Sequence, residues 1–388
     1  MDAALYAKML SDNSFTDLKK IQHKYTVAAV AEMIGLLRQT AYKAIPLKDF
    51  NGNELVYLEH LAPINLSASK TLLTVKPSGT DYGLNAMEEE IHSTLTIENI
   101  RSSRESIHRI LCGSAPKDEA ENRIFGMKKG LDFISDPSKD ITEENIFTLY
   151  MLTVGDYLGG EEKLMPGQYY RHDSVFIVGD KVEHQGLNSK MLPDYIAELV
   201  SFIQNEHSMN DLLKAAVIHF YIAYLHPYFD GNGRMARLLH LWYLVRQGFS
   251  ATLFIAFSSY INKSKTKYYK AFTQVEENSS ISGLLDVTPF LTYFIGNVYN
   301  LLKDTTPQTE TMEKYKEALT QGSVTEKENN LFLFICSAYG ETKFSTKQLE
   351  KDFGNAAYAT IRSFVLKFES LGILKSEKLG NRIKYFLV

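Results

Sequence analysis

The sequence has few of the features that mark secreted, membrane-spanning or metal-scaffolded proteins. It contains two cysteines in 388 residues, Cys112 and Cys336, which lie far apart in apolar helical contexts. Such spacing fits neither a disulfide framework nor a metal site, and it favours a reducing compartment. No apolar run is long enough to cross a bilayer, and the first residues lack the apolar stretch of a signal peptide. We therefore expect a cytoplasmic protein without a membrane partner.

A strong excess of charge of one sign is also missing. The chain has 42 Lys and Arg residues against 46 Asp and Glu residues, which gives a formal net charge of −4. This balance argues against nucleic-acid affinity of the whole chain, although it permits a local basic patch. A hydrophobic content of 45% is ordinary for a globular protein. The length predicts two or three domains and is ample for a sizeable core.

The most informative stretch runs from His226 to Arg237 and reads His-Pro-Tyr-Phe-Asp-Gly-Asn-Gly-Arg-Met-Ala-Arg. Its Gly231-Asn232-Gly233 segment predicts a turn whose backbone N–H groups approach a ligand closely. The residues that follow have the spacing of a helix. A glycine-rich turn that leads into a helix N-terminus is an anion site, because unpaired N–H groups and the helix dipole both point at the ligand.

The charged residues of this stretch predict phosphates and a base. Arg234 and Arg237 share one helix face, and two guanidiniums at a helix N-terminus are unfavourable unless anions answer them. His226, at the end of a helical run predicted over residues 212–225, is well placed as a general base. Asp230 offers a hard oxygen to Mg²⁺ held mainly by nucleotide phosphates. Taken singly, each of these residues is more often a turn former or a structural side chain.

The stretch resembles the Fic family motif His-Pro-Phe-x-Asp/Glu-Gly-Asn-Gly-Arg-x-x-Arg and departs from it at Tyr228, where Phe is usual. The ring is kept, so we expect the change to be tolerated. The resemblance implies a mainly α fold with a Fic-type helical core and a small β-hairpin flap. It also implies transfer of AMP from ATP to a Ser, Thr or Tyr hydroxyl of a target protein and of the chain itself. By the same resemblance, His226 is expected to be catalytic and Asp230 to bind Mg²⁺. The residues expected to bind the nucleotide are Asp230, Gly231, Asn232, Gly233, Arg234, Met235, Ala236 and Arg237.

A second pattern lies upstream, at Thr94-Leu-Thr-Ile-Glu98-Asn99. It resembles the Ser/Thr-x-x-x-Glu-Gly/Asn signature of Fic proteins with an N-terminal inhibitory helix, which is expected here over about residues 85–111. By that resemblance Thr94, Glu98 and Asn99 are inhibitory, and Glu98 binds Arg237 in a bidentate fork. The same spacing is common on solvated helices. The run of Glu88, Glu89 and Glu90 just before it is predicted to be a solvated face.

Residues 167–181 are rich in β-branched and aromatic side chains and end in Gly-Asp-Lys, which predicts a hairpin. The resemblance implies that this hairpin is the flap that binds the target's backbone as an added strand. An ordinary surface hairpin is the alternative. The residues expected to face the target are Phe176, Ile177, Val178, Gly179, Asp180 and Lys181, and Val178 and Gly179 are also expected beside the nucleotide.

A Tyr-Tyr pair at residues 268 and 269 resembles a Fic segment whose first tyrosine lies against the nucleotide. Tyr268 is therefore predicted to pack on the adenine or ribose, with core packing as the alternative and Tyr260 as a weaker candidate. The lysines around this pair are predicted to be solvated; they are Lys263, Lys265, Lys267 and Lys270.

The domain organisation is predicted from breaks in composition and periodicity. It comprises an N-terminal helical region (1–112), the Fic core (113–302), a linker (303–326) and a C-terminal unit (327–388). Three helices and two strands in the last unit resemble a winged helix-turn-helix domain, which would bind DNA or act as a protein-docking or homodimer module. The functional alternatives are a DNA-binding transcriptional regulator with a nucleotide-sensing Fic core, and a Fic enzyme that removes AMP or uses another phosphate-containing donor.

Overall fold

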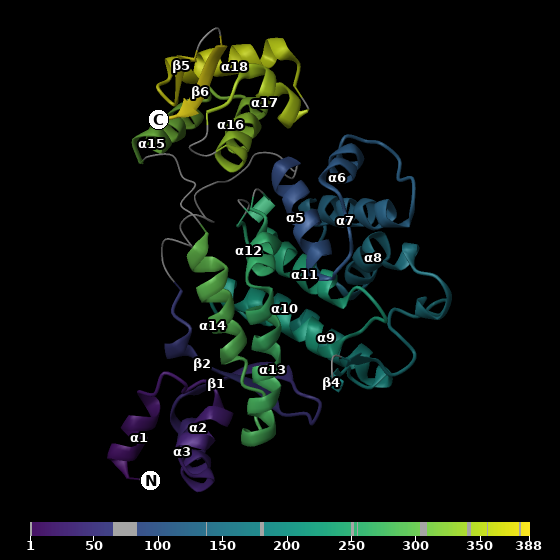
Figure 1. Ribbon diagram of the computed structural model, residues 1–388, viewed down its shortest axis with the longest axis vertical. Helices are drawn as coiled ribbons and strands as arrows, with labels where there is room; N and C mark the ends of the chain where they lie inside the picture. Colours follow the sequence, from purple (N-terminus) through teal and green to yellow (C-terminus); the bar gives the residue numbers. More distant parts are fainter. Residues whose placement is uncertain are drawn as a thin grey trace.

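The fold was obtained as a computed structural model that describes residues 2–64, 84–136, 138–178, 182–249, 252–253, 255–302, 309–339, 343–354, 356–379 and 382–388. Within these ranges the chain is mainly helical, with three two-stranded antiparallel sheets. The mainly α fold expected from the sequence is thereby confirmed (Figure 1). Among the described helices, none combines the length and the apolar character that a membrane crossing requires.

The N-terminal part is not purely helical, contrary to the expectation for residues 1–112. Helices α1, α2 and α3 pack around a small apolar core of their own, and a strand pair, β1 and β2, follows them. The Asp49 side chain closes the turn between the strands by accepting from the N–H groups of Asn51 (2.9 Å) and Asn53 (2.8 Å). The elements are α1 (Ala3–Leu10), α2 (Leu18–Lys24), α3 (Val27–Thr40), β1 (Tyr42–Lys48) and β2 (Glu54–Leu58).

Pairing with a distant segment explains why this strand pair was missed. The backbone of Val56 exchanges hydrogen bonds with Leu285 (3.1 Å) and Val287 (2.9 Å), which lie far along the chain. Tyr42 on β1 also donates to Asp286 over 3.1 Å. The strands are therefore fixed by the helical core rather than by a periodicity that residues 42–58 display on their own.

The helix expected over residues 85–111 is two helices, α5 (Leu84–Ile97) and α6 (Arg104–Leu111). The break falls at Asn99, whose φ of 58° lies in the left-handed region. Ser103 then caps α6 by accepting from the N–H of Ser106 at 3.0 Å. Asparagine tolerates a left-handed conformation better than most residues, so the same residue both ends α5 and prevents its continuation.

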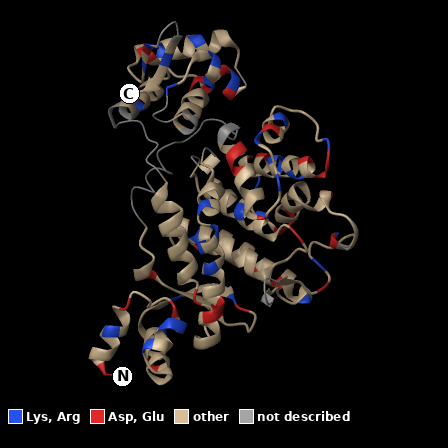
Figure 2. Cartoon of the chain, in the orientation of Figure 1, with Lys and Arg blue, Asp and Glu red and all other residues tan. Residues whose placement is uncertain are grey.

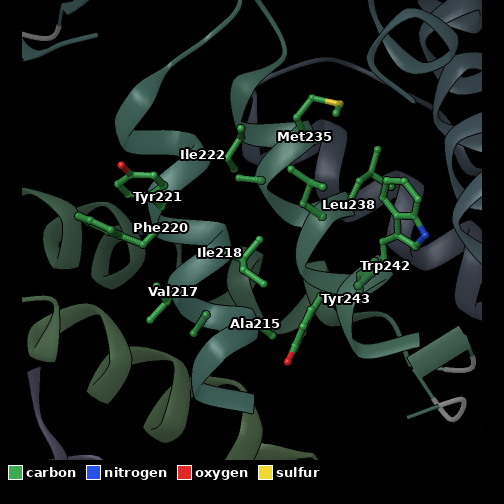
Figure 3. Packing of buried hydrophobic residues seen from close by; sticks show 14 of the residues in the cluster. Ala215, Val217, Ile218, Phe220, Tyr221, Ile222, Met235, Leu238, Trp242 and Tyr243 are labelled. Carbon is green, nitrogen blue, oxygen red and sulfur yellow. The ribbon is translucent and has the colours of Figure 1, made fainter. Parts of the chain in front are cut away.

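Helices α10 and α11 lie in the main apolar core, and nearly all of their residues are buried (Figure 3). This burial agrees with sequences that are apolar on every face of α10. The surrounding elements carry the loops that meet at the end of this pair. They are α7 (Glu119–Ser135), α8 (Glu143–Thr153), β3 (Phe176–Val178), β4 (Val182–Gln185), α9 (Leu192–Asn205), α10 (Asp211–Leu225), α11 (Asn232–Arg246), α12 (Phe257–Lys263), α13 (Lys265–Ser282) and α14 (Thr288–Asn297).

The C-terminal elements enclose a separate apolar core, and α16 and α17 lie against α5. Three helices followed by an antiparallel strand pair occur in the predicted order over residues 327–388. The winged-helix assignment and DNA binding stay predictions. The elements are α15 (Thr309–Thr320), α16 (Glu326–Ala338), α17 (Thr346–Phe353), α18 (Tyr358–Ser370), β5 (Leu374–Leu379) and β6 (Arg382–Leu387).

Charges of both signs are spread over this C-terminal unit (Figure 2). Lys367 on α18 forms an ion pair with Glu328 at 2.7 Å, and Lys343 pairs with Glu377. These contacts neutralise two of the lysines of the unit. A uniformly basic face is therefore not what the described residues present.

Candidate active site

The N-terminus of α11 is built by residues that are close neighbours in sequence. Gly231 is the N-cap, with φ of 84°, and no side chain caps the helix. A Cβ at Gly231 would lie 2.6 Å from Val154 Cγ2, so both the turn and the packing require glycine. Asn232 fixes the entry by accepting from the Tyr228 N–H (3.0 Å) and donating to the Tyr228 carbonyl (2.8 Å).

The helix begins at Asn232, so only the first part of the predicted Gly-Asn-Gly turn is a turn. The N–H of Met235 donates to the Gly231 carbonyl at 2.9 Å and starts the helical pattern. The N–H groups of Asn232, Gly233 and Arg234 precede this bond and have no acceptor within the helix. They are the donors that the helix end offers to an anion.

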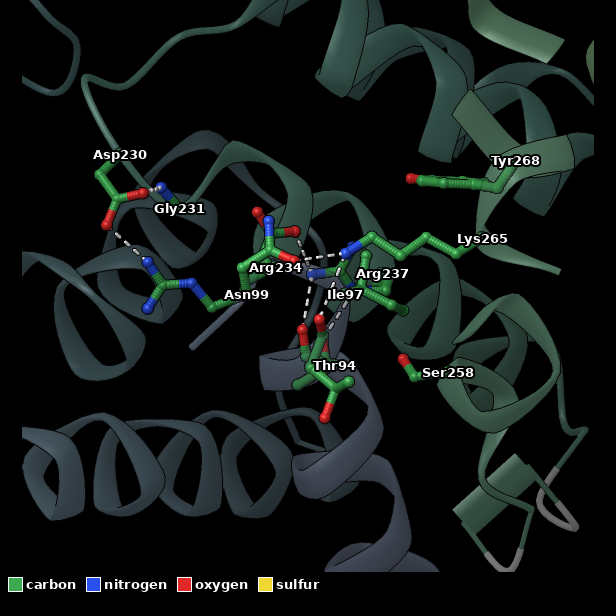
Figure 4. Close-up of polar contacts among 12 residues, drawn as sticks. Thr94, Ile97, Asn99, Asp230, Gly231, Arg234, Arg237, Ser258, Lys265 and Tyr268 are labelled. Carbon is green, nitrogen blue, oxygen red and sulfur yellow. Dashed lines mark hydrogen bonds and ion pairs between the residues drawn. The ribbon is translucent and has the colours of Figure 1, made fainter. Parts of the chain in front are cut away.

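Each of the two arginines is answered by a carboxylate (Figure 4). Arg234 Nη2 pairs with Asp230 Oδ2 at 2.6 Å, while Asp230 Oδ1 accepts from the Gly231 N–H at 2.6 Å. Arg237 Nη2 pairs with Glu98 Oε1, also at 2.6 Å. The sequence predicted phosphates as the answering anions, and two carboxylates fill those roles here.

Both arginines retain donors without a partner. They are 2% and 3% exposed, and Arg234 Nε and Arg237 Nη1 are buried without a hydrogen-bond acceptor. A buried donor that lacks an acceptor costs about 1–3 kcal/mol. The site therefore has unused capacity for an anion with more oxygens than one carboxylate supplies.

Arg237 holds α5 through two residues rather than through a bidentate fork on Glu98. Its Nε donates to Thr94 Oγ1 at 2.6 Å, and Nη2 is 3.4 Å from the Thr94 carbonyl in addition to its pair with Glu98. The predicted bidentate pairing with Glu98 is thus corrected: Glu98 binds only Nη2, and the Nε donor binds the Thr94 hydroxyl instead. Burial acts to lower the pKa of Arg237, but the Glu98 carboxylate together with Tyr268 and Tyr269 outweighs this effect and raises that pKa.

Glu98 lies directly over the start of α11. A Cβ added to Gly233 would overlap Glu98 Oε1 and would lie 3.3 Å from Arg237 Nη1. The carboxylate therefore lies against Gly233 in the first turn of α11. A phosphate group placed there would have to displace Glu98, because two anions do not share one such position.

The end of α5 that presents Glu98 is a complete helix C-cap. Asn99 N–H donates to the Thr96 carbonyl (3.0 Å) and Ile100 N–H donates to the Leu95 carbonyl (2.9 Å). These are the two bonds of a Schellman motif, whose left-handed residue is Gly or Asn. The residue after the glutamate is Asn99 for this reason. The geometry explains why the pattern requires Gly or Asn at that position.

Helix α13 holds the same end of α5 from outside. Lys265 Nζ donates to Asn99 Oδ1 at 2.7 Å and lies 3.4 Å from the Thr96 carbonyl. The Tyr269 hydroxyl donates to the Ile97 carbonyl at 3.3 Å. Lys265 was expected to be solvated, so this expectation is corrected: a cation at a helix C-terminus is stabilised by the carbonyls there.

The other end of α5 is anchored by a buried glutamate. Glu90 accepts from the Ser258 N–H at 2.8 Å and from its hydroxyl, and it is 1% exposed. Burial raises the pKa of Glu90, while the bonds from Ser258 act in the opposite direction. The expectation of a solvated Glu88–Glu90 face is therefore wrong for Glu90, which caps the N-terminal turn of α12.

His226 follows α10 in a left-handed conformation, with φ of 53° and ψ of 59°. Its Nδ1 lies 3.2 Å from the Ala223 carbonyl; a carbonyl only accepts, so Nδ1 carries the proton and Nε2 has the free lone pair. Burial lowers the pKa of His226 to about 4, and the bond to Ala223 opposes this shift. The imidazole is therefore neutral near pH 7 and chemically suited to accept a proton.

The flap segment forms a short antiparallel pair, with strand β3 beginning at Phe176 rather than near Gly167. Phe176 and Ile177 are 51% and 39% exposed, and Val178 pairs with Val182. The predicted target-facing residues Gly179, Asp180 and Lys181 lie outside the described residues. Strand β3 thus presents two large apolar side chains to solvent.

Three residues predicted to contact the nucleotide have buried side chains, and their contacts with a nucleotide stay predictions. Met235, which Figure 3 labels, and Ala236 are fully buried, with their side chains in the apolar core. Tyr268 is 3% exposed and its hydroxyl bonds with His219 Nε2 at 2.8 Å. This is the core-packing alternative weighed from the sequence. Its neighbour Tyr269 is 44% exposed.

Asp230 is the residue available to a divalent cation. Its side chain is 44% exposed, and within the part of the chain that is described no group of three or more His, Cys, Asp or Glu residues is arranged for a metal. A single carboxylate does fit Mg²⁺ that keeps most of its ligands from phosphates and water. To bind the cation through Oδ2, Asp230 would have to break its ion pair with Arg234 or let the cation and Arg234 share that oxygen.

Sequence reasoning missed Arg171, Lys265 and Glu90. Their contacts join residues 55, 166 and 168 positions apart. Nothing in the local pattern around Arg171 marks it. The mixed polar and apolar character of the Lys265 and Glu90 segments predicted solvation instead.

Comparison with known proteins agrees with this geometry. Residues 140–244 match the Fic/DOC family, so the chain contains a Fic domain. Its relatives include protein adenylyltransferase fic-1 of Caenorhabditis briggsae, 23% identical over 252 residues. Another is protein adenylyltransferase Fic of Drosophila ananassae, 25% identical over 206 residues. The matches cover 62% and 52% of this chain but 42% and 36% of those relatives, so the chain spans about two fifths of their length.

Solved structures similar to this chain include Fic proteins of low sequence identity. A Fic family protein from Desulfovibrio desulfuricans G20 has a TM-score of 0.46 at 18% identity, covering 78% of this chain and 86% of that one. Fic-1 from C. elegans has a TM-score of 0.41 at 20% identity, with 60% and 63% covered.

Proposed function

We propose that the chain transfers AMP from ATP to a hydroxyl side chain of a target protein, and to itself, and that Glu98 restrains this reaction. The observation that carries the proposal is the position of the Glu98 carboxylate. It lies against Gly233 in the first turn of α11 and pairs with buried Arg237, which is where a phosphate would bind. A neutral histidine with a free Nε2 stands at the end of the preceding helix.

In this proposal the phosphates of ATP lie over the start of α11. The N–H groups of residues 232–234 bind them, and Arg237 and the unused donor of Arg234 hold the outer oxygens. The target hydroxyl lies beside His226. Its oxygen attacks the α-phosphorus as Nε2 takes the proton, and a new O–P bond forms. The bond between the α-phosphorus and the oxygen that bridges to the β-phosphorus breaks, and pyrophosphate leaves. Positioning and charge stabilisation provide most of the acceleration.

Mg²⁺ bound by Asp230 and the phosphates would neutralise charge on the polyphosphate. The exposed carboxylate of Asp230 fits this role. The remaining groups act whether or not the cation is bound: Arg237 orients the outer phosphate, and Asn232 fixes the turn that leads into the helix.

Inhibition follows from competition for Arg237. While Glu98 pairs with Nη2, the guanidinium does not reach the γ-phosphate, and ATP binds in a pose that does not align its α-phosphorus with the hydroxyl. A glycine at position 98 removes the competing anion. It also leaves Arg237 without its carboxylate, so ATP should stabilise Glu98→Gly more than the wild type.

The reaction type is tested with Glu98→Gly and ATP labelled at either the α- or the γ-phosphate. Label on protein from the α position alone is the expected result. Label from the γ position alone would mean phosphorylation and would overturn the proposal. A protein that binds ATP and takes label from neither would point to AMP removal or to another phosphate-containing donor. Glu98→Gly/His226→Ala is the matched control and should take none.

A further inference from the structure

We propose that Arg171 is a positioning residue that fixes the backbone of His226 and joins the catalytic loop to the base of the flap. The proposal rests on the function proposed above, because it concerns the same histidine. Arg171 lies between the end of α8 and strand β3, outside the motif and outside the phosphate site. Its role is to place the base rather than to touch a substrate.

Arg171 donates hydrogen bonds to backbone carbonyls at His226 and near it. Its Nε donates to the His226 carbonyl at 2.8 Å, and its own N–H donates to the Pro227 carbonyl at 3.0 Å. The two Nη groups donate to the carbonyls of Asp173 and Leu187. One side chain thus connects the catalytic loop with both ends of the flap, because Asp173 precedes β3 and Leu187 follows β4.

The held conformation needs such support. His226 has φ of 53°, and a left-handed conformation is unfavourable for a residue with a Cβ. The backbone of Gly186 packs tightly against both residues, because a Cβ at Gly186 would lie 2.8 Å from Arg171 Nη2 and 3.1 Å from His226 Cβ. The N–H of Leu187 adds a bond to the Leu225 carbonyl at 3.1 Å. Arg171 and the Gly186–Leu187 backbone therefore clamp the loop from two sides.

The chemistry of Arg171 argues for a specific role. It is 2% exposed, and no carboxylate forms an ion pair with it among the residues that are described. All of its bonded N–H groups meet backbone carbonyls. A buried cation is costly unless its donors are satisfied, and only a planar guanidinium spans several carbonyls with fixed directions.

Lys214 offers a matched control elsewhere in the core. It is 1% exposed and donates to the carbonyls of Ile203, at 3.0 Å, and Glu206. It is thus a second buried cation bound to carbonyls, but it serves the end of α9. Lys214→Met should cost stability without changing the turnover of folded protein.

The test compares Arg171→Met, Arg171→Lys and Lys214→Met in the full chain carrying Glu98→Gly. We measure AMP transfer per folded molecule and ATP affinity. Displacement of a reacting group by about 1 Å costs about 100-fold, so Arg171→Met should lower kcat about 100-fold while the Kd for ATP changes less than about twofold. Arg171→Lys keeps the charge but not the fork, and should recover about tenfold of that loss.

A second readout does not depend on AMP transfer. NMR titration of His226, assigned with His226→Ala, should give a pKa near 4 in the parent and a higher one in Arg171→Lys, because the loosened loop exposes the ring. If Glu98→Gly transfers no AMP, the proposed function fails and this titration alone decides the role of Arg171. An unchanged titration, or a kcat in both Arg171 variants equal to that of Lys214→Met, would overturn the inference. Should Arg171→Met fail to fold, Arg171→Lys carries both measurements.

Discussion

Two helix ends meet at the site, and they are built in different ways. The N-terminus of α11 is made by neighbours: Asp230 bonds to Gly231 and Arg234, and Asn232 bonds to Tyr228. The C-terminus of α5 is positioned by residues 143 and 166 places away, Arg237 and Lys265. The first end is a property of a short peptide, while the second exists only once the whole domain has folded. Under the proposed function, the N-terminus of α11, which would bind phosphates, should therefore be the robust end, and the end of α5 that carries Glu98 should be the adjustable one.

The largest effect should come from removing the proposed general base, His226, which precedes the N-terminus of α11. In the Glu98→Gly background, His226→Ala should lower AMP transfer by at least about 100-fold, the lower bound for a general base. ATP affinity should remain, because the phosphate site lies on α11. The assays are label incorporation and nucleotide binding. Transfer within tenfold of the parent would remove His226 from the reaction.

The next effect concerns the acidity of that base. Because the pKa of His226 is lowered to about 4, the neutral form that accepts the proton prevails above that pH. Transfer by Glu98→Gly should therefore stay level between about pH 8 and 5 and fall about tenfold per unit below the pKa. A rate that already halves near pH 6.5 would show that the ring is not buried as described.

The restraining end should respond to smaller changes. Thr94→Val keeps the shape and removes the acceptor of Arg237 Nε, whereas Glu98 remains in place. Since a net hydrogen bond contributes about 0.5–1.5 kcal/mol, we expect transfer to rise roughly 2- to 10-fold. Ser at position 94 is the control and should behave like the wild type. A rise as large as that of Glu98→Gly would mean that Thr94, and not Glu98, is the main restraint.

The smallest effect tests the C-cap of α5. Asn99→Ala places a Cβ in a left-handed position without the local hydrogen bonds of Asn, and should loosen the cap by about 1 kcal/mol and raise transfer about fivefold. Asn99→Gly keeps the backbone and loses only the bond to Lys265, so it should change transfer less than about twofold. Equal effects of both variants would contradict the role assigned to the left-handed conformation.

Predictability from sequence follows the same division. The helix pair, the turn at Gly231 and the placement of Arg234 and Arg237 on one face of α11 were predicted, because contacts between residues one to four positions apart are encoded in their spacing. The burial of the two arginines was not predicted. The pairing of Glu98 with Arg237 was predicted through a family resemblance. Its geometry was not predicted, since the Nε donor of Arg237 binds Thr94 rather than Glu98. Whether Glu98 restrains the reaction remains a proposal.

The missed features share one cause. Arg171, Lys265 and Glu90 act on backbone or side chains more than fifty residues away, and a charged side chain gives no sign in the sequence that it will be buried. Residues 42–58 form strands because they pair with the segment around Asp286. Tyr268 is predicted beside the nucleotide by resemblance; its hydroxyl bonds with His219, and its contact with a nucleotide stays a prediction.

The central claim is that Glu98 holds Arg237 in place of a phosphate. It is tested most directly by the initial rate of transfer from α-labelled ATP in wild type, Glu98→Gln and Glu98→Gly. Bonds to charged groups contribute about 1.5–3 kcal/mol, so Glu98→Gly should be about 10- to 100-fold faster than the wild type. Glu98→Gln, which keeps an acceptor without the charge, should lie between them. Equal rates in all three proteins would contradict the account.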